Sequence, residues 1–261
     1  MNQPDRSPKT AVLAPQTGRL FGVGVGPGDP DLLTRRAVRV IEQAEVVAHF
    51  AARRRPGNSL RTIESLLRPE QIIERLEYPV TTEAIPPEAY RELIDTFYAE
   101  SAARVARHLD AGRDVAVLSE GDPFFYGSYM HLHVRLAGRY PTEVVPGVTA
   151  FSAASAAAGM PVATSEERFT VLPGILPHGE LVETLRSGDA VVIMKVGRHL
   201  PAITEALRAA GRELEAVYVE RASFPEQRVL PITDHDGSDA PYFSLVLVPG
   251  RRLVAVDALT A

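Results

Sequence analysis

The chain has 261 residues, of which 45% are hydrophobic and 23% charged, and its formal net charge is -5. This composition is that of a globular protein with one large or two modest domains, and the acidic balance argues against nucleic acid as a partner. The lack of cysteine excludes disulfides, thiolate metal sites and a cysteine nucleophile, and it fits a reducing, cytoplasmic location. No apolar run approaches the roughly 20 residues of a membrane helix, so we expect no membrane association.

The first predicted elements surround a glycine loop. The apolar run from Leu20 to Val25 predicts a buried strand, and Gly26-Pro27-Gly28-Asp29-Pro30 ends it, because neither strands nor helices accommodate these residues internally. Asp31 or Thr34 is suited to cap the next helix, which we expect over residues 35–41. A strand that enters a helix through a glycine loop is how many α/β folds form a ligand site at the sheet edge.

This loop does not match the dinucleotide fingerprint Gly-x-Gly-x-x-Gly. Counted from Gly22, the third glycine falls on Pro27, and counted from Gly24 it falls on Asp29. A carboxylate at that point would face the pyrophosphate, and prolines remove backbone donors from the loop. A nicotinamide-dependent oxidoreductase therefore remains an alternative function that rests on the glycine loop alone.

A basic turn follows the second predicted strand, at residues 44–50. Arg53, Arg54 and Arg55 stand next to each other there, before a Pro-Gly pair. Like charges in a row usually form a solvated face, but this turn comes where an α/β ligand site opens. The three arginines are therefore candidates for binding anionic substrate groups, with plain surface as the alternative. Farther on, helical spacing of apolar residues predicts a long helix between Pro87 and Gly112.

Two later loops repeat the design of the first. Predicted strands at 115–118 and 143–145 enter the loops Gly121-Asp122-Pro123 and Pro146-Gly147, and each loop leads into a helix. Because the carboxyl ends of parallel strands meet at one sheet edge, the first loop and the Gly121-Asp122-Pro123 loop are expected to lie close together. The helix at 149–158 is rich in alanine and serine, which predicts close packing against a neighbour.

The second half of the chain is predicted to be richer in strands. We expect strands at 169–173, 189–196, 216–222, 227–230 and 242–248, with helices at 180–186 and 201–210. Because the last strands follow one another without helices, this sheet is predicted to be mixed. The fold class is therefore α/β with two α/β domains, over residues 18–160 and 161–261, after a disordered tail at residues 1–17.

Five motifs occur in order between Leu20 and Val248. They are Gly-x-Gly-Pro-Gly-Asp-Pro-x-Leu-Leu-Thr, Gly-Asp-Pro, Pro-Gly-Val-Thr-Ala, a strand that ends in Met194, and Glu-Arg-Ala followed by Gln-Arg. Together they resemble the motifs of the tetrapyrrole methylases. Glu120 before the second loop, and Phe-Tyr-Gly-Ser-Tyr after it, resemble the branch that methylates a meso carbon of a reduced, carboxylate-rich tetrapyrrole.

The resemblance implies an S-adenosylmethionine (SAM) dependent methyltransferase that needs no metal. It implies a cofactor cleft between the two domains, a tetrapyrrole substrate and a homodimer. It places the SAM contacts on residues from both halves of the chain, namely Pro27, Gly121, Asp122, Phe125, Thr149, Ala150, Met194, Ala222, Tyr242, Phe243 and Ser244.

No catalytic base is identified by the motifs. Glu120 and His49 are hypotheses for the base that takes the proton lost from the methylated carbon. Apart from the oxidoreductase, two alternatives remain, namely another methyltransferase of the same family and a metabolite-binding module without catalysis.

Overall fold

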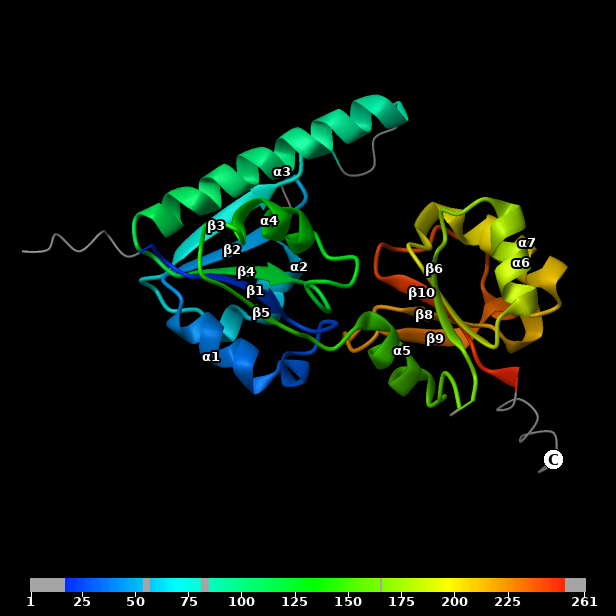
Figure 1. The fold of residues 1–261 in the computed structure, drawn as a ribbon. Coiled ribbons are helices and arrows are strands. Elements are labelled where there is room, and N and C mark those ends of the chain that lie inside the picture. The colour runs from blue at the N-terminus through cyan, green and yellow to red at the C-terminus, as the bar shows by residue number, and fades with distance from the viewer. Residues whose placement is uncertain (1–16, 54–56, 81–84, 165, 252–261) are drawn as a thin grey trace, which may run out of the picture.

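Two α/β domains form the part of the chain that the computed structural model describes, which is residues 17–53, 57–80, 85–164 and 166–251. Figure 1 shows the two domains side by side, each with its own sheet. The predicted fold class is confirmed. The predicted boundary at residue 160 stays a prediction.

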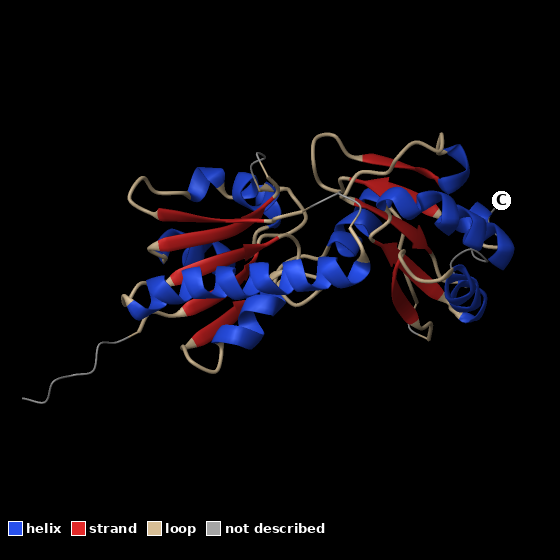
Figure 2. Cartoon of the chain, turned by 90° about the horizontal axis from the view of Figure 1, so that it is seen from above, coloured by secondary structure: helices blue, strands red, loops and turns tan. Residues whose placement is uncertain are grey.

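The first domain contains a five-stranded sheet with the order β3-β2-β4-β1-β5, in which all neighbours are parallel. The strands are β1 (Leu20–Gly24), β2 (Val46–Ala51), β3 (Ile72–Glu77), β4 (Val115–Ser119) and β5 (Thr142–Val145). Its helices are α1 (Arg35–Gln43), α2 (Asn58–Thr62), α3 (Pro87–Asp110) and α4 (Tyr129–Leu136). Because the strands are parallel, the loops after β1, β4 and β5 leave the same edge, which faces the second domain (Figures 1 and 2).

Helices cover both faces of this sheet, with α3 and α4 on one face and α1 on the other (Figure 1). Of the two predicted caps of α1, Thr34 is correct, because its Oγ1 accepts the Ala37 N–H at 3.1 Å. The burial of Val40 and Ile41 fixes the inner face of the helix. The first turns of α3 extend past the sheet toward the second domain (Figure 2).

The second domain contains a sheet with the order β6-β7-β10-β8-β9. Its strands are β6 (Phe169–Pro173), β7 (Ala190–Met194), β8 (Val217–Glu220), β9 (Arg228–Pro231) and β10 (Ser244–Val248), and its helices are α6 (His178–Ser187) and α7 (Leu200–Ala210). β6 and β7 are parallel and the other pairs are antiparallel, so the predicted mixed sheet is confirmed. α6 and α7 lie on the face turned away from the first domain (Figure 1).

Two strands of this sheet end earlier than the sequence predicts. β7 ends at Met194 and β8 at Glu220, because the next residues, Lys195 and Arg221, have φ angles of 56° and 47°. This left-handed backbone cannot continue a strand. Both strands therefore turn sharply at the edge that faces the first domain.

Helix α5 (Ala150–Ala158) packs on the second sheet, although it precedes residue 160. Ala154 is fully buried against Val192, Val219 and Leu245. Its alanines let the helix backbone come close to the strands, which is the close packing that the sequence predicts. The loop before α5 therefore connects the two sheets.

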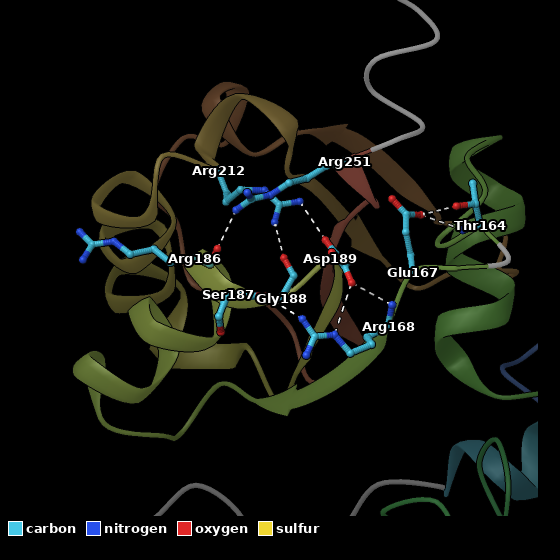
Figure 3. Close-up of polar contacts among 9 residues, drawn as sticks. All are labelled: Thr164, Glu167, Arg168, Arg186, Ser187, Gly188, Asp189, Arg212 and Arg251. Carbon is cyan, nitrogen blue, oxygen red and sulfur yellow. Dashed lines mark hydrogen bonds and ion pairs between the residues drawn. The ribbon is translucent and has the colours of Figure 1, made fainter.

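A buried arginine fastens the far end of the second domain. The guanidinium of Arg212, 2% exposed, donates to the carbonyl oxygens of Leu185, Gly188, Asp189 and Pro249 at 3.3, 3.2, 3.2 and 2.7 Å. It also pairs with the Glu215 carboxylate. Figure 3 shows the contacts of Arg212 with Gly188 and Asp189, which lie between the end of α6 and the start of β7. The fork satisfies carbonyl groups that the end of a helix leaves without partners.

Replacing Arg212 with methionine is expected to destabilise the protein by about 1–3 kcal/mol, because several buried carbonyl groups lose their donor. The matched control is Arg208→Met, which removes an exposed arginine that pairs with Glu213. Chemical denaturation measures both changes. A free energy of unfolding for the Arg212 variant equal to that of the control would contradict the assigned role.

Candidate functional site

Three glycines bring the loops after β1, β4 and β5 into direct contact. A Cβ on Gly24 would lie 2.6 Å from the Gly147 nitrogen, and a Cβ on Gly147 would lie 2.1 Å from the Gly121 oxygen. Gly26 and Gly121 pair as an isolated antiparallel bridge, with N–H to oxygen contacts of 3.3 and 2.7 Å. The expectation that the first two loops meet at one edge is confirmed, and the structure adds the loop after β5 to them. We call this edge and the second-domain loops opposite it the junction.

Asp122 ties the second loop to the third. Its Oδ2 accepts the Gly147 N–H at 3.1 Å, and its Oδ1 accepts the Phe124 N–H at 2.9 Å. Both oxygens are thus bound to backbone groups. Beside it, Gly121 has a φ of 64°, and a Cβ there would meet its nearest atoms, in Val148, Thr149 and Ala150, at 3.8 to 3.9 Å.

The predicted cofactor residues of the second domain lie opposite these loops. Ala150, Met194 and Ala222 all border the apolar cluster beneath α5. Phe243 accepts the Arg221 N–H through its carbonyl at 2.7 Å, and Ser244 begins β10. The ends of β7 and β8 and the start of β10 therefore share the edge that faces the first sheet.

Contacts between the domains join their loops. The Asp29 N–H donates to Ser223 Oγ at 3.1 Å, and the Phe224 ring packs on Gly28. On the other side, the Lys195 ammonium lies 5.1 Å from the centre of the Tyr126 ring.

Backbone strain is concentrated here. Within the described ranges, the non-glycine residues with positive φ are Tyr126, Lys195, Arg221 and Ser223. All four lie in loops at the junction. Left-handed backbone in such residues costs free energy and is common at ligand sites.

A chain of aromatic contacts connects Phe125 with the second domain. Phe125 contacts Phe151 of α5 with ring centres 5.5 Å apart, and Phe151 contacts Phe169 of β6 at 5.2 Å. Pro27, next to the Gly26 bridge, is buried. The structure thus brings together residues of both domains that the sequence assigned to the cofactor.

The two candidate bases flank the start of α2. Glu120 is half-buried, and its Oε1 accepts the Ser59 N–H at 3.2 Å. Burial raises the pKa of Glu120, while hydrogen bonds from the Ser59 and Glu120 backbone oppose this shift. His49 is 2% exposed within β2, with its Nδ1 behind Gly57, and burial lowers its pKa. Glu120 is the more accessible of the two.

The sequence interpretation did not assign Tyr78 and Tyr98 to the site. The hydroxyl groups of Tyr78 and Tyr98 both bond to Ser128 Oγ, the second at 3.2 Å. Burial raises the pKa of Tyr78, so its hydroxyl stays neutral. Tyr242 belongs to the other domain and is 85% exposed.

The predicted arginine turn is described only in part. Arg53 is exposed and its Nε lies 3.9 Å from a Glu77 oxygen. Arg54 and Arg55 lie outside the described residues. Substrate binding by this turn remains a prediction.

The arrangement suits a cationic, methyl-bearing ligand better than a phosphate. The first, second and third loops consist of small, proline and acidic residues without lysine or arginine, and Asp122 and Glu120 add carboxylates. In the described part of the chain, no three histidine, aspartate or glutamate side chains gather as a metal site would require. The site residues thus fit SAM.

Comparison with known proteins identifies the family. The profile described as tetrapyrrole (corrin/porphyrin) methylases matches residues 19–234. The chain belongs to this family. Tetrapyrrole methylases take their methyl group from SAM, so the chain is a SAM-dependent methyltransferase. The interpretations as an oxidoreductase or a non-catalytic binding module are set aside.

Named tetrapyrrole methylases match along nearly the whole chain. A precorrin-2 C(20)-methyltransferase of Sinorhizobium sp. is 53% identical over 90% of this chain and 96% of its own length. The cobalamin biosynthesis protein CobIJ of Mycobacterium bovis is 51% identical, and the match covers 90% of this chain and 46% of CobIJ. A cobalt-precorrin-2 C(20)-methyltransferase of Salmonella typhimurium is 29% identical over 88% and 96%.

A solved structure of the family agrees with the fold. Uroporphyrin-III C-methyltransferase from Thermus thermophilus, in complex with S-adenosylhomocysteine, has a TM-score of 0.63 and 25% identity, and covers 92% of this chain and 100% of its own.

Proposed function

We propose that this methyltransferase methylates C20 of precorrin-2 in cobalamin biosynthesis. The observation that carries the proposal is the 53% identity to a precorrin-2 C(20)-methyltransferase along nearly the full length of both chains. The relative named for the cobalt-containing substrate is only 29% identical. This difference favours the metal-free form as the substrate.

The deciding experiment is incubation with SAM and precorrin-2, followed by mass spectrometry and NMR assignment of the methylated carbon. A parallel reaction with cobalt-precorrin-2 compares the two substrate forms. A methyl group on another carbon would assign the chain to a different reaction of the family.

The proposed cofactor site consists of the residues named from the motifs. From the first domain, Pro27, Gly121 and Thr149 would contact SAM. From the second domain, the contacts would come from Met194, Ala222 and the segment 242–244. Ala150 and Phe125 lie between the two groups, and the contacts of the loops with one another support this site.

SAM supplies an activated methyl group on a cationic sulfur, and a nucleophilic carbon can accept it without a covalent enzyme intermediate. The chain must hold the two reactants in line, which contributes up to about 7–11 kcal/mol in favourable cases. Carboxylates and backbone oxygens at the junction favour the cationic donor. The substrate carbon must then release its proton, and Glu120 is the proposed acceptor because its raised pKa makes it a stronger base than an exposed glutamate.

Replacing Asp122 with alanine is expected to raise the dissociation constant for SAM about tenfold, because the second and third loops lose their carboxylate link. Asp122→Asn keeps one acceptor oxygen, so its dissociation constant for SAM should lie between those of the wild type and the alanine variant. Calorimetric titration measures both affinities. Wild-type affinity in the alanine variant would remove Asp122 from the site.

We also propose that the chain forms a homodimer, as is common in the family. Light scattering should give twice the mass of the chain at micromolar concentration, and a monomer mass would contradict this.

No helix within the described ranges is long and apolar enough to cross a membrane. We place the enzyme in the cytoplasm, where its lack of cysteine is suited to reducing conditions.

A further inference from the structure

The Glu-Arg-Ala…Gln-Arg motif forms a loop whose internal contacts the sequence does not explain. Residues 221–227 join β8 to β9, and we call them the docking loop. Gln227 Oε1 accepts the Ser223 N–H at 2.8 Å, and the Phe224 N–H donates to the Arg221 carbonyl at 2.9 Å. Arg221 and Ser223 have left-handed backbone, with φ of 47° and 69°. The loop therefore needs support to keep this shape.

Glu220 provides that support from below. Its side chain is 8% exposed, and its two oxygens lie 3.1 Å from Arg221 Nη1 and 3.7 Å from Arg228 Nη1. Tyr218 donates its hydroxyl hydrogen to Oε2 at 3.1 Å. One carboxylate thus holds an arginine at each end of the docking loop. With its oxygens engaged in this way, Glu220 acts through the loop rather than on a reacting atom.

The tip of the docking loop presses on the first glycine loop. Ser223 Oγ accepts the Asp29 N–H at 3.1 Å. The Phe224 ring covers Gly28 so closely that a Cβ there would lie 2.3 Å from a ring carbon. Gly28 has a φ of 151° and follows Pro27, which belongs to the proposed cofactor site.

Phe224 also reaches the opposite side of the site. Its ring stacks on Phe243 with centres 5.6 Å apart, and Phe243 precedes β10. One side chain therefore touches the first glycine loop and the segment 242–244, which are two parts of the proposed cofactor site from different domains. Its position sets their separation.

We propose that Glu220 is a positioning residue for cofactor binding, which holds the docking loop so that Phe224 fixes the first glycine loop against the cofactor. The proposal rests on the proposed function of the site. It explains why the motif contains a carboxylate, two arginines and a glutamine around a small loop. A purely structural role would make the same contacts without affecting cofactor affinity.

The test compares Glu220→Gln with the wild-type enzyme in two assays. Calorimetry with S-adenosylhomocysteine measures binding without turnover, and steady-state kinetics separates KM for SAM from kcat. We expect the dissociation constant and KM to rise about tenfold or more, with kcat changed less than about threefold. The matched control is Glu213→Gln, because Glu213 is also an arginine-paired carboxylate of the second domain, on the α7 side. It should leave both constants unchanged.

Phe224→Leu keeps the test decisive if the Glu220 variant folds poorly. This change removes the ring from Gly28 and leaves the carboxylate cluster intact, so it should weaken S-adenosylhomocysteine binding in the same way. Combined with Glu220→Gln, the two effects should be less than additive, because both act through one loop.

The possible outcomes distinguish failure of the proposed function from failure of the positioning role of Glu220. If the wild-type enzyme does not bind S-adenosylhomocysteine, the proposed function fails. If it binds and the folded Phe224 and Glu220 variants bind equally well, the function stands and the positioning role is overturned.

Discussion

Replacing Glu120 with glutamine is expected to lower kcat about 100-fold or more while leaving the fold intact, since loss of a general base typically costs this much. Glutamine keeps an oxygen that can accept the Ser59 N–H but cannot take a proton from the substrate carbon. Single-turnover kinetics with saturating SAM measures the chemical step.

The pH dependence of the wild-type enzyme should identify the same group. A base acts only when deprotonated, so activity should fall as the pH decreases through the pKa of Glu120. Burial raises this pKa, so the decline should begin at a higher pH than for an exposed glutamate. The glutamine variant should lack this inflection.

Stability should respond in the opposite direction. A carboxyl whose pKa is raised on folding binds its proton more tightly in the native state, so its contribution to stability is lost as the pH rises through the folded pKa. Above that pH, Glu120→Gln removes the cost of a buried charge. The variant should therefore be no less stable than the wild type at neutral pH, although its kcat is far lower.

The control is Glu45→Gln, which alters another carboxylate that accepts a backbone N–H, that of Asp114 at 2.7 Å. This contact lies at the start of β4, whereas Glu120 lies just after its end, so kcat should not change. A wild-type kcat in the Glu120 variant would exclude this residue as the base. The choice would then return to His49.

The strands and loops of the site could be predicted from local sequence because apolar runs end abruptly there at glycine and proline residues. The apolar run before Gly26 and the Gly121-Asp122-Pro123 break each mark a strand end, and both ends were placed correctly within one or two residues. Parallel order then put the loops at one edge without any knowledge of contacts. The short helix α2 was missed because five residues show no clear periodicity.

The contacts that shape the site could not be predicted in this way. Asp29 and Ser223 are 194 positions apart, and nothing in either neighbourhood indicates their hydrogen bond. Left-handed backbone at Lys195 arises from its place at the junction, since lysine itself does not favour it. Asp122 was assigned to the cofactor by resemblance, whereas in the structure its carboxylate accepts hydrogen bonds from the Gly147 and Phe124 backbone.

Replacing Gly147 with alanine is expected to cost about 3 kcal/mol or more of stability, at the upper end for overpacking, and to abolish measurable SAM binding. The new Cβ would lie 2.1 Å from the Gly121 oxygen and 2.9 Å from the Gly24 Cα. These are backbone atoms, so no side-chain rotation relieves the clash. The three loops must separate, and Asp122 then loses the Gly147 N–H.

The matched control is Gly138→Ala, because no atom lies within 4 Å of a Cβ at that turn. Its free energy of unfolding should stay within about 0.5 kcal/mol of the wild type, as for most surface changes. Chemical denaturation and calorimetric titration with SAM measure both variants. If Gly147→Ala keeps wild-type stability and affinity, the loops are not held by close backbone packing, and cofactor binding does not depend on the contact of Gly24, Gly121 and Gly147.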